Sequence, residues 1–123
     1  MQNPNVPLAV SYYQAMAAKN LTKMENLLHP NVTLISPMAQ VNGKEAVFNA
    51  VKHFATFIDK LTIRAYSGEN EHVFVAYNVE CPAPINTSKA IALLTFQDGL
   101  IYNYELFYDA RPFEIKKEQI FGE

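Results

Sequence analysis

The spacing of apolar residues changes near residue 60 of this 123-residue chain, and that change limits the folds it can adopt. Before residue 60, apolar side chains recur three or four positions apart, as they do on one face of a helix. After it, runs of β-branched and aromatic residues are separated by short turn-forming segments, which is typical of an antiparallel meander. Helices gathered early and strands gathered late predict an α+β fold, with the helices packed on one face of a curved sheet.

Three helices are expected in the first half of the chain. Residues 6–18 carry a continuous apolar stripe at helical spacing. Residues 22–29 begin with the spacing of a capping box, and they end before Pro30, because a proline disfavours helical geometry in the residue that precedes it. Residues 42–58 begin with a second capping pattern and continue as a helical stripe.

A short strand is predicted between the second and third helices, and four longer strands follow the third. The short strand covers residues 32–36; the longer ones cover residues 61–67, 72–80, 88–97 and 100–109. Asp98-Gly99 joins the last two strands and is a strong signal for a tight hairpin. No element is predicted for the residues after Pro112.

The composition predicts one domain over residues 1–123, because half of the chain is hydrophobic and only 18% is charged. A net charge of -2 predicts no nucleic-acid partner. The single cysteine, Cys81, cannot form an internal disulfide, and no apolar run approaches the ~20 residues of a membrane span. We therefore expect a soluble, cytoplasmic protein with no membrane partner.

The outer face of the predicted sheet is unusually apolar. Residues 90–96 are apolar at nearly every position, whereas a half-exposed antiparallel strand should alternate. Three helices can cover one face of such a sheet but not both, so we expect a homodimer that covers the outer face. The alternative is that tyrosines on this face are simply exposed to water.

Asp109 is the sharpest chemical feature, since it ends a hydrophobic strand where aspartate is disfavoured. Strict alternation groups it with Ile101 and Phe107, so its carboxyl should point toward the helix-covered side. Burial in an apolar cavity would raise the pKa of that carboxyl and suit it to acid-base chemistry. The alternative is that Asp109 caps the following turn or pairs with Arg111.

Tyr13 lies on the apolar stripe of the first helix, and a buried phenol needs a hydrogen-bond partner. Its hydroxyl could face a cavity and donate to a ligand oxygen, or it could make one structural hydrogen bond within the core. The side chains expected along a cavity wall are those of His53, Phe54, Phe57 and Phe107. No metal site is predicted, because the three histidines lack ligand spacing.

Three segments resemble the SnoaL-like branch of the nuclear transport factor 2-like superfamily. They are residues 28–37, residues 42–47 and residues 98–109, and the resemblance extends from about residue 6 to residue 113. It implies a cone-shaped α+β fold with a hydrophobic cavity between sheet and helices, commonly in a dimer. Members of the superfamily bind or transform small apolar molecules, and others have no enzymatic role.

Single residues can be compared with two enzymes of this superfamily. Tyr13 matches the oxyanion donor of ketosteroid isomerase, but the two acids of that enzyme fall on Ser36 and near Ala92, which disfavours its mechanism. Asp109 matches the last-strand aspartate of limonene epoxide hydrolase, yet residues 75–79 lack the Arg-x-Asp pair that this hydrolase needs.

Two hypotheses follow. In the first, the protein is a pocket protein acting as a cyclase, isomerase or dehydratase on a small apolar molecule, with Asp109 moving a proton and Tyr13 donating a hydrogen bond. Ser36 would join the cavity wall as a ligand-binding residue, and no cofactor or metal is expected. In the second, the protein is a non-catalytic ligand-binding or dimerisation module.

Overall fold

The computed structural model describes residues 3–114 and contains four helices and six strands within them. The helices are α1 (Asn5–Ala17), α2 (Leu21–Asn26), α3 (Lys44–Phe57) and α4 (Arg111–Glu114). The strands are β1 (Leu28–Ile35), β2 (Gln40–Asn42), β3 (Lys60–Glu69), β4 (His72–Glu80), β5 (Thr87–Gln97) and β6 (Leu100–Tyr108). They form one sheet in the order β2-β1-β6-β5-β4-β3, antiparallel throughout except for the β1–β6 pair. The predicted α+β class is confirmed.

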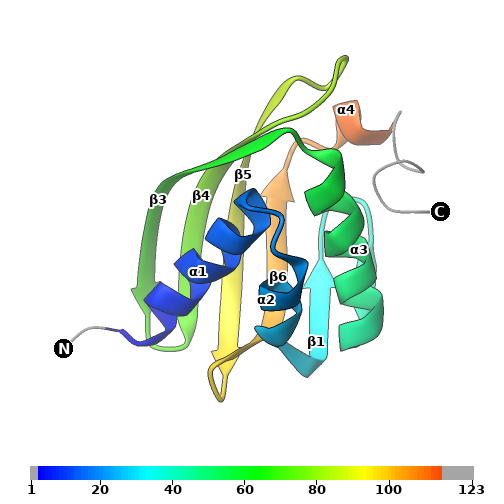
Figure 1. The fold of residues 1–123 in the computed structure, drawn as a ribbon. Coiled ribbons are helices and arrows are strands. Elements are labelled where there is room, and N and C mark those ends of the chain that lie inside the picture. Colours follow the sequence, from blue (N-terminus) through cyan, green and yellow to red (C-terminus); the bar gives the residue numbers. More distant parts are fainter. Residues whose placement is uncertain (1–2, 115–123) are drawn as a thin grey trace.

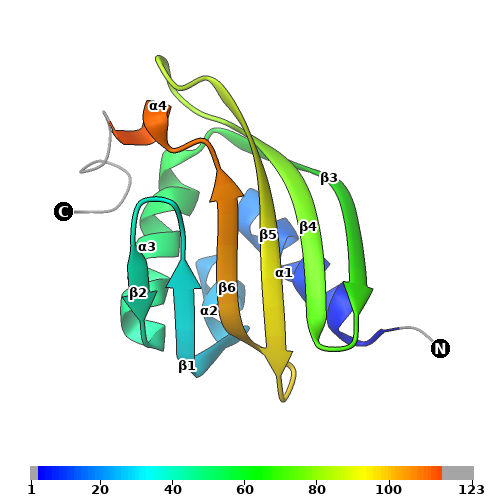
Figure 2. The ribbon, with the colours of Figure 1, turned by 180° about the vertical axis from the view of Figure 1, so that it is seen from behind.

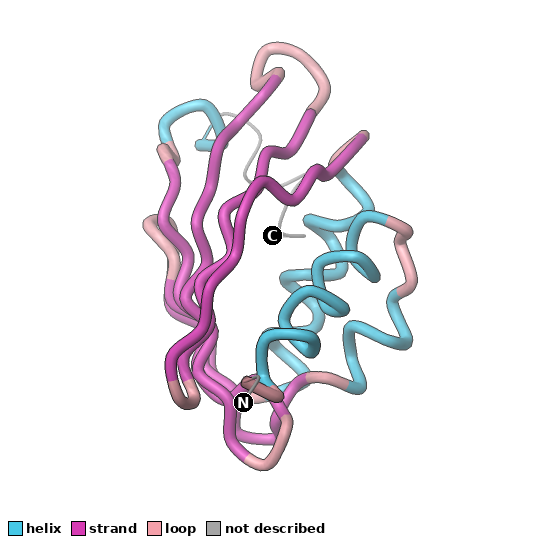
Figure 3. The backbone as a smooth tube through the Cα atoms, turned by 90° about the vertical axis from the view of Figure 1, so that its left-hand side faces the viewer, coloured by secondary structure: helices cyan, strands magenta, loops and turns pink. Residues whose placement is uncertain are grey.

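The first three helices lie on one face of the curved sheet, and the other face carries none of them (Figures 1, 2 and 3). Helix α1 packs over β3 and β4, whereas α3 packs over β1 and β2. The two helices therefore cover opposite halves of the sheet and leave the middle strands, β5 and β6, facing the space between them. The short helix α4 follows β6 at one end of the sheet (Figure 1).

The boundary between helix α2 and strand β1 lies earlier in the chain than predicted. The helix ends at Asn26 and the strand already begins at Leu28, which is fully buried. The side chain of Asn20, rather than that of Thr22, caps α2 by accepting a hydrogen bond from the Lys23 amide at 3.2 Å. Pro30 is tolerated inside β1 because the pairing with β6 is interrupted there, so the missing N–H leaves no ladder bond unmade.

A β-bulge in β6 reverses the alternation that the sequence predicted. Tyr102 is an extra residue between two paired positions, so Ile101 and Tyr104 both face the helices. Every residue after the bulge therefore points to the opposite side of the sheet from the one predicted. Phe107, expected along the cavity wall, is 50% exposed on the outer face, and Asp109 follows it to the solvent side. Both predicted orientations are wrong for this reason.

Two glycine-containing segments, one hairpin turn and one helix start, have the backbone geometry that their sequences require. Asp98 and Gly99 both have positive φ values, +56° and +75°, as a tight primed hairpin turn requires. Gly43 precedes α3 with a φ of +92°, a conformation that side-chain-bearing residues rarely adopt, so glycine is needed at this helix start. Strand β2 and helix α4 were not predicted, because three or four residues give too little periodicity to detect.

Candidate functional site

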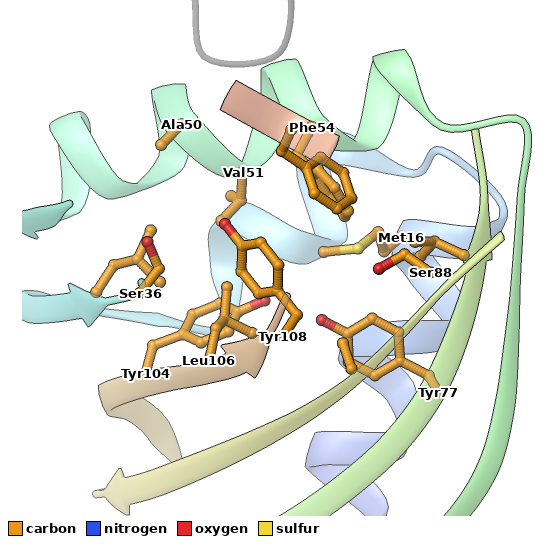
Figure 4. Close-up of a pocket in the computed structure, with 14 residues that line it drawn as sticks. Met16, Ser36, Ala50, Val51, Phe54, Tyr77, Ser88, Tyr104, Leu106 and Tyr108 are labelled. Carbon is orange, nitrogen blue, oxygen red and sulfur yellow. The ribbon is translucent and has the colours of Figure 1, made fainter. Parts of the chain in front are cut away.

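One pocket opens between the helices and the middle of the sheet, where α1 and α3 diverge. Its free volume is about 40 Å³. Figure 4 shows side chains entering it from the sheet below and from α3 above. The lining residues are Met16, Leu34, Ser36, Ala50, Val51, Phe54, Tyr77, Val79, Ser88, Ala90, Tyr104, Leu106, Tyr108 and Phe113.

The wall of this pocket carries no charge. Its polar groups are the hydroxyls of two serines and three tyrosines, and every other lining side chain is apolar. No carboxylate, histidine, lysine, arginine or cysteine of the described residues lines it. The arrangement can hold an apolar molecule and form hydrogen bonds to it. It contains no charged group that could pair with a charge on a bound ligand.

A cluster of four buried tyrosines, contributed by α1, β4 and β6, includes two residues of the pocket wall, Tyr77 and Tyr104, and two residues behind it, Tyr12 and Tyr13. The hydroxyl of Tyr13 lies 3.0 Å from that of Tyr104 and 3.5 Å from that of Tyr77. The ring of Tyr12 packs edge-on against those of Tyr13 and Tyr104, with centroids 5.1 and 5.5 Å away. Alternation along β4 places Tyr77 inward together with Val73, a signal already present in the sequence.

The two contacts of the Tyr13 hydroxyl differ in length and in what they assign. Tyr13 and Tyr104 are 3.0 Å apart and either hydroxyl can be the donor, whereas in the longer 3.5 Å contact Tyr13 is the donor and the Tyr77 oxygen the acceptor. The hydroxyl hydrogen of Tyr77 therefore has no partner within the cluster. Since Tyr77 lines the pocket, it can donate to an acceptor atom of a bound molecule.

Burial keeps these phenols protonated. Loss of solvation raises the pKa of Tyr77, and it raises the pKa of Tyr13 and of Tyr104 well above the ordinary tyrosine value. Neighbouring phenols add to each shift, because a phenolate formed at one site would be repelled by charge at the next. The cluster is thus a set of neutral hydrogen-bonding groups at neutral pH.

Tyr13, predicted as a ligand's hydrogen-bond donor, is not among the residues that line the pocket. Its side chain has no exposed surface, and both of its hydrogen-bond partners are other phenols. A molecule in the pocket would meet Tyr77 and Tyr104 instead. This placement corresponds to the structural alternative considered for Tyr13.

Asp109 lies outside the pocket. Its carboxylate accepts hydrogen bonds from the Arg111 backbone amide at 3.0 Å and from the Arg111 guanidinium at 2.6 to 3.2 Å, and its side chain is 52% exposed. The hydrogen bonds from the Arg111 side chain and amide lower the pKa of Asp109 to about 2. The carboxylate is therefore ionised and faces solvent, and the turn-capping alternative describes it correctly.

The remaining predicted wall residues divide into two groups. Ser36 and Phe54 line the pocket. Phe57 packs against the core elsewhere, and His53 is half-buried with Nδ1 2.7 Å from the Asn49 carbonyl oxygen one turn earlier. Phe113, from the segment where no element was predicted, lines the pocket and is only 2% exposed.

Other reactive groups do not gather into a second centre within residues 3–114. Burial, together with the nearby Asp59 carboxylate, raises the pKa of the Cys81 thiol to about 11, so it is not a thiolate at neutral pH. No cluster of three or more His, Cys, Asp or Glu that could hold a metal ion occurs in this part of the chain. Among the same residues, no helix has the length and apolar character needed to cross a membrane.

Comparisons with known proteins agree with this architecture. The sequence profile of the SnoaL-like domain matches residues 9–104. Among solved structures, a protein from Kribbella flavida gives a TM-score of 0.84 at 19% identity, covering 91% of this chain and 92% of its own. A steroid delta-isomerase from Pseudomonas aeruginosa gives 0.79 at 19% identity, with 96% and 90% covered.

A third similar structure is an NTF2-like protein of unknown function from Cytophaga hutchinsonii, with a TM-score of 0.79 at 22% identity and 93% and 97% coverage. Comparison with curated proteins gave no significant match. Fold and pocket together define a helix-covered, curved-sheet domain with an apolar pocket. The profile match spans most of the sequence, and the chain belongs to the SnoaL-like domain family.

Proposed function

We propose that the pocket binds a small, neutral, largely apolar molecule that carries one hydrogen-bond acceptor, such as a carbonyl or ether oxygen. The uncharged wall carries this proposal. A charged ligand would lose its hydration there without gaining a counter-charge, because no charged side chain lines the pocket. Such a transfer costs on the order of several kcal/mol. The Tyr77 hydroxyl supplies a directional contact to that acceptor, and the aliphatic and aromatic side chains of the wall supply most of the remaining contact.

Binding without proton transfer is the function that the lining favours. A general base must lie within hydrogen-bond reach of the proton it removes. The pocket offers only serine hydroxyls and phenols, and Asp109 faces solvent. Ser36, the position that resembles the base of ketosteroid isomerase, accepts from the Met38 and Ala39 amides at 3.3 Å and has no neighbouring base among the lining residues.

A pocket-filling substitution tests the proposal. Ala50→Leu places three additional carbon atoms at the pocket wall, and Ala65→Leu adds the same atoms at an exposed position on β3. We expect a neutral fluorescent probe such as Nile red to bind the wild type and the Ala65→Leu variant alike, and to bind the Ala50→Leu variant at least about tenfold more weakly. Equal binding by all three proteins would place the probe elsewhere and overturn the proposal.

We further propose that a second copy of the chain covers the outer face of the sheet. Phe74, Ile91 and Phe107 are each 45 to 50% exposed there, and Ile91 lies opposite Phe107 in the β5–β6 register. Large apolar side chains gathered on one exposed surface favour a protein interface. A self-complementary contact across a two-fold axis is the commonest way for such a face to be covered.

A further inference from the structure

The aromatic ring of Phe113 is buried in the pocket although its helix lies at the edge of the fold. The ring packs 5.2 Å from that of Tyr108, at an interplanar angle of 76°, and 6.4 Å from that of Phe54. The edge-to-face contact with Tyr108 is a favourable arrangement for an aromatic pair. The protein thus already places one benzyl group in its own pocket.

Within residues 3–114, few other contacts hold α4 in place. The backbone hydrogen bonds of Phe113 and Glu114 both go to the carbonyl oxygen of Ala110, within the same turn. The Asp109–Arg111 ion pair also lies within this turn and is exposed to solvent, where such pairs contribute little. Among the described residues, the Phe113 side chain is therefore the main contact that fixes α4 to the body of the protein.

The free volume decides whether a ligand can enter without moving this ring. With Phe113 in place the pocket has about 40 Å³, whereas a cavity that accepts benzene has roughly 150 Å³. The space that remains cannot enclose even a single ring, so a ring-containing molecule, Nile red included, binds here only after a lining side chain has moved or with part of it outside the pocket. Of the lining aromatic side chains, Phe113 is the one carried by neither a strand nor a long helix, so it can leave without disturbing either.

We propose that Phe113 is a removable plug, and that the subsite it fills takes a neutral aryl group of the ligand. This inference rests on the proposed binding function and adds the ligand class and the means of entry. The ring of the ligand replaces the ring of Phe113 between Phe54 and Tyr108, while α4 swings away from the pocket. Because the plug competes with the ligand, the wild type binds on the order of 10- to 100-fold more weakly than a protein without the ring.

Toluene is a suitable probe, with methylcyclohexane as the matched non-aromatic ring. Binding is measured by calorimetry and by the rise in melting temperature for the wild type, Phe113→Ala and the control Tyr66→Ala, which removes a similarly large ring from an exposed position next to α1. We expect toluene to bind the Phe113→Ala variant at least about tenfold more tightly than the other two. We also expect toluene to bind that variant more tightly than methylcyclohexane does.

A second measurement uses the intact ring. In a protein with isotope-labelled phenylalanine rings, the Phe113 signal is identified by its loss in Phe113→Leu, a variant that keeps an apolar side chain at this position. Saturation of the wild type with toluene should move that signal to the position of a solvent-exposed ring. This readout remains valid if the Phe113→Ala variant does not fold.

The possible outcomes distinguish a failure of the plug proposal from a failure of the proposed binding function. Equal toluene affinity for wild type and Phe113→Ala, or a Phe113 signal that stays unchanged at saturation, overturns the plug. Equal affinity for toluene and methylcyclohexane overturns the aryl subsite. If toluene binds no variant while Nile red still distinguishes Ala50→Leu from Ala65→Leu, the further inference fails alone. If neither probe binds, the proposed function fails with it.

Discussion

The hydroxyl of Tyr13 on α1 lies 3.0 Å from that of Tyr104 on β6, and both side chains are buried. This single hydrogen bond joins the first helix to the last strand at the back of the pocket. The same hydroxyl also lies 3.5 Å from that of Tyr77 on β4, so Tyr13 is in contact with a phenol from each of two strands.

Tyr13→Phe should lower the free energy of unfolding by about 1–3 kcal/mol, because it leaves buried phenol oxygens without their partner. The measurement is denaturant unfolding of the variant and the wild type. Tyr66→Phe removes a hydroxyl from a side chain that is 54% exposed and should leave stability unchanged. A double-mutant cycle with Tyr104→Phe should show a coupling of about 0.5–1.5 kcal/mol; additive effects would contradict the hydrogen bond.

Stability should fall steeply in alkaline solution. The four buried tyrosines have folded-state pKa values above that of the unfolded chain, so above pH ~10 the folded protein holds more protons than the unfolded one. Each such phenol then lowers the free energy of unfolding by up to about 1.4 kcal/mol per pH unit, while its contribution is fully present below that pH.

This loss of stability is tested by following phenolate absorbance and circular dichroism together as the pH rises. The absorbance of the buried phenols should appear only as the circular dichroism signal is lost. Ionisation of all seven tyrosines in a protein that remains folded would contradict the buried cluster.

Lys19 should contribute to stability by capping α3. Its ammonium group donates to the carbonyl oxygens of Ala55 at 2.6 Å and Ile58 at 2.5 Å, which are otherwise unpaired at the helix end. Lys19→Met should therefore cost about 1–2 kcal/mol in the free energy of unfolding. Lys23→Met, an equivalent change at an exposed position of α2, is the control, and equal losses from both would refute the cap.

Phe107→Glu should convert a dimer into a monomer in sedimentation experiments, because a carboxylate would be buried at the centre of the outer face. Tyr66→Glu changes a similarly exposed aromatic side chain on the helix-covered face, next to α1. It should leave the association state unchanged. A wild-type protein that sediments as a monomer at micromolar concentration would end the dimer proposal.

Asp109→Asn should leave ligand affinity within about twofold of the wild-type value, since the carboxylate faces solvent and exposed ion pairs contribute little. The same probe titration used for the pocket measures this. With a pKa of about 2, the carboxylate keeps its charge at any pH near neutrality, so affinity should also not change between pH 5 and pH 8. A large loss of binding in the variant would restore Asp109 to the site.

The long elements could be predicted from the sequence because their periodicity extends over many residues. The stripe of α1 and the alternation of β4 are examples, and the turn at Asp98-Gly99 has chemistry specific to its conformation. The family resemblance added the arrangement of these elements. The boundary at Pro30 was placed wrongly because local propensity favoured a helix, whereas burial of Leu28 in the sheet determined the outcome.

The site was predicted less well, and one residue explains most of the error. The bulge at Tyr102 has no clear signature in the sequence, yet it exchanges the two faces of β6. It turns Tyr104 toward the pocket and Asp109 toward solvent. Phe113 was missed because α4 is held by packing against residues distant in the sequence, and four residues carry no period of their own.

The position of β6 has a consequence for how the chain assembles. Of the six strands described, it is the last in the chain, yet it lies between β1 and β5 and links the two halves of the sheet. Until residues 100–108 emerge from the ribosome, the hairpin of β1 and β2 has no route of strand pairing to the β3–β5 meander. Nascent chains that stop before β6 would display two additional open sheet edges, on β1 and β5, so chaperone binding should be greatest just before this strand appears.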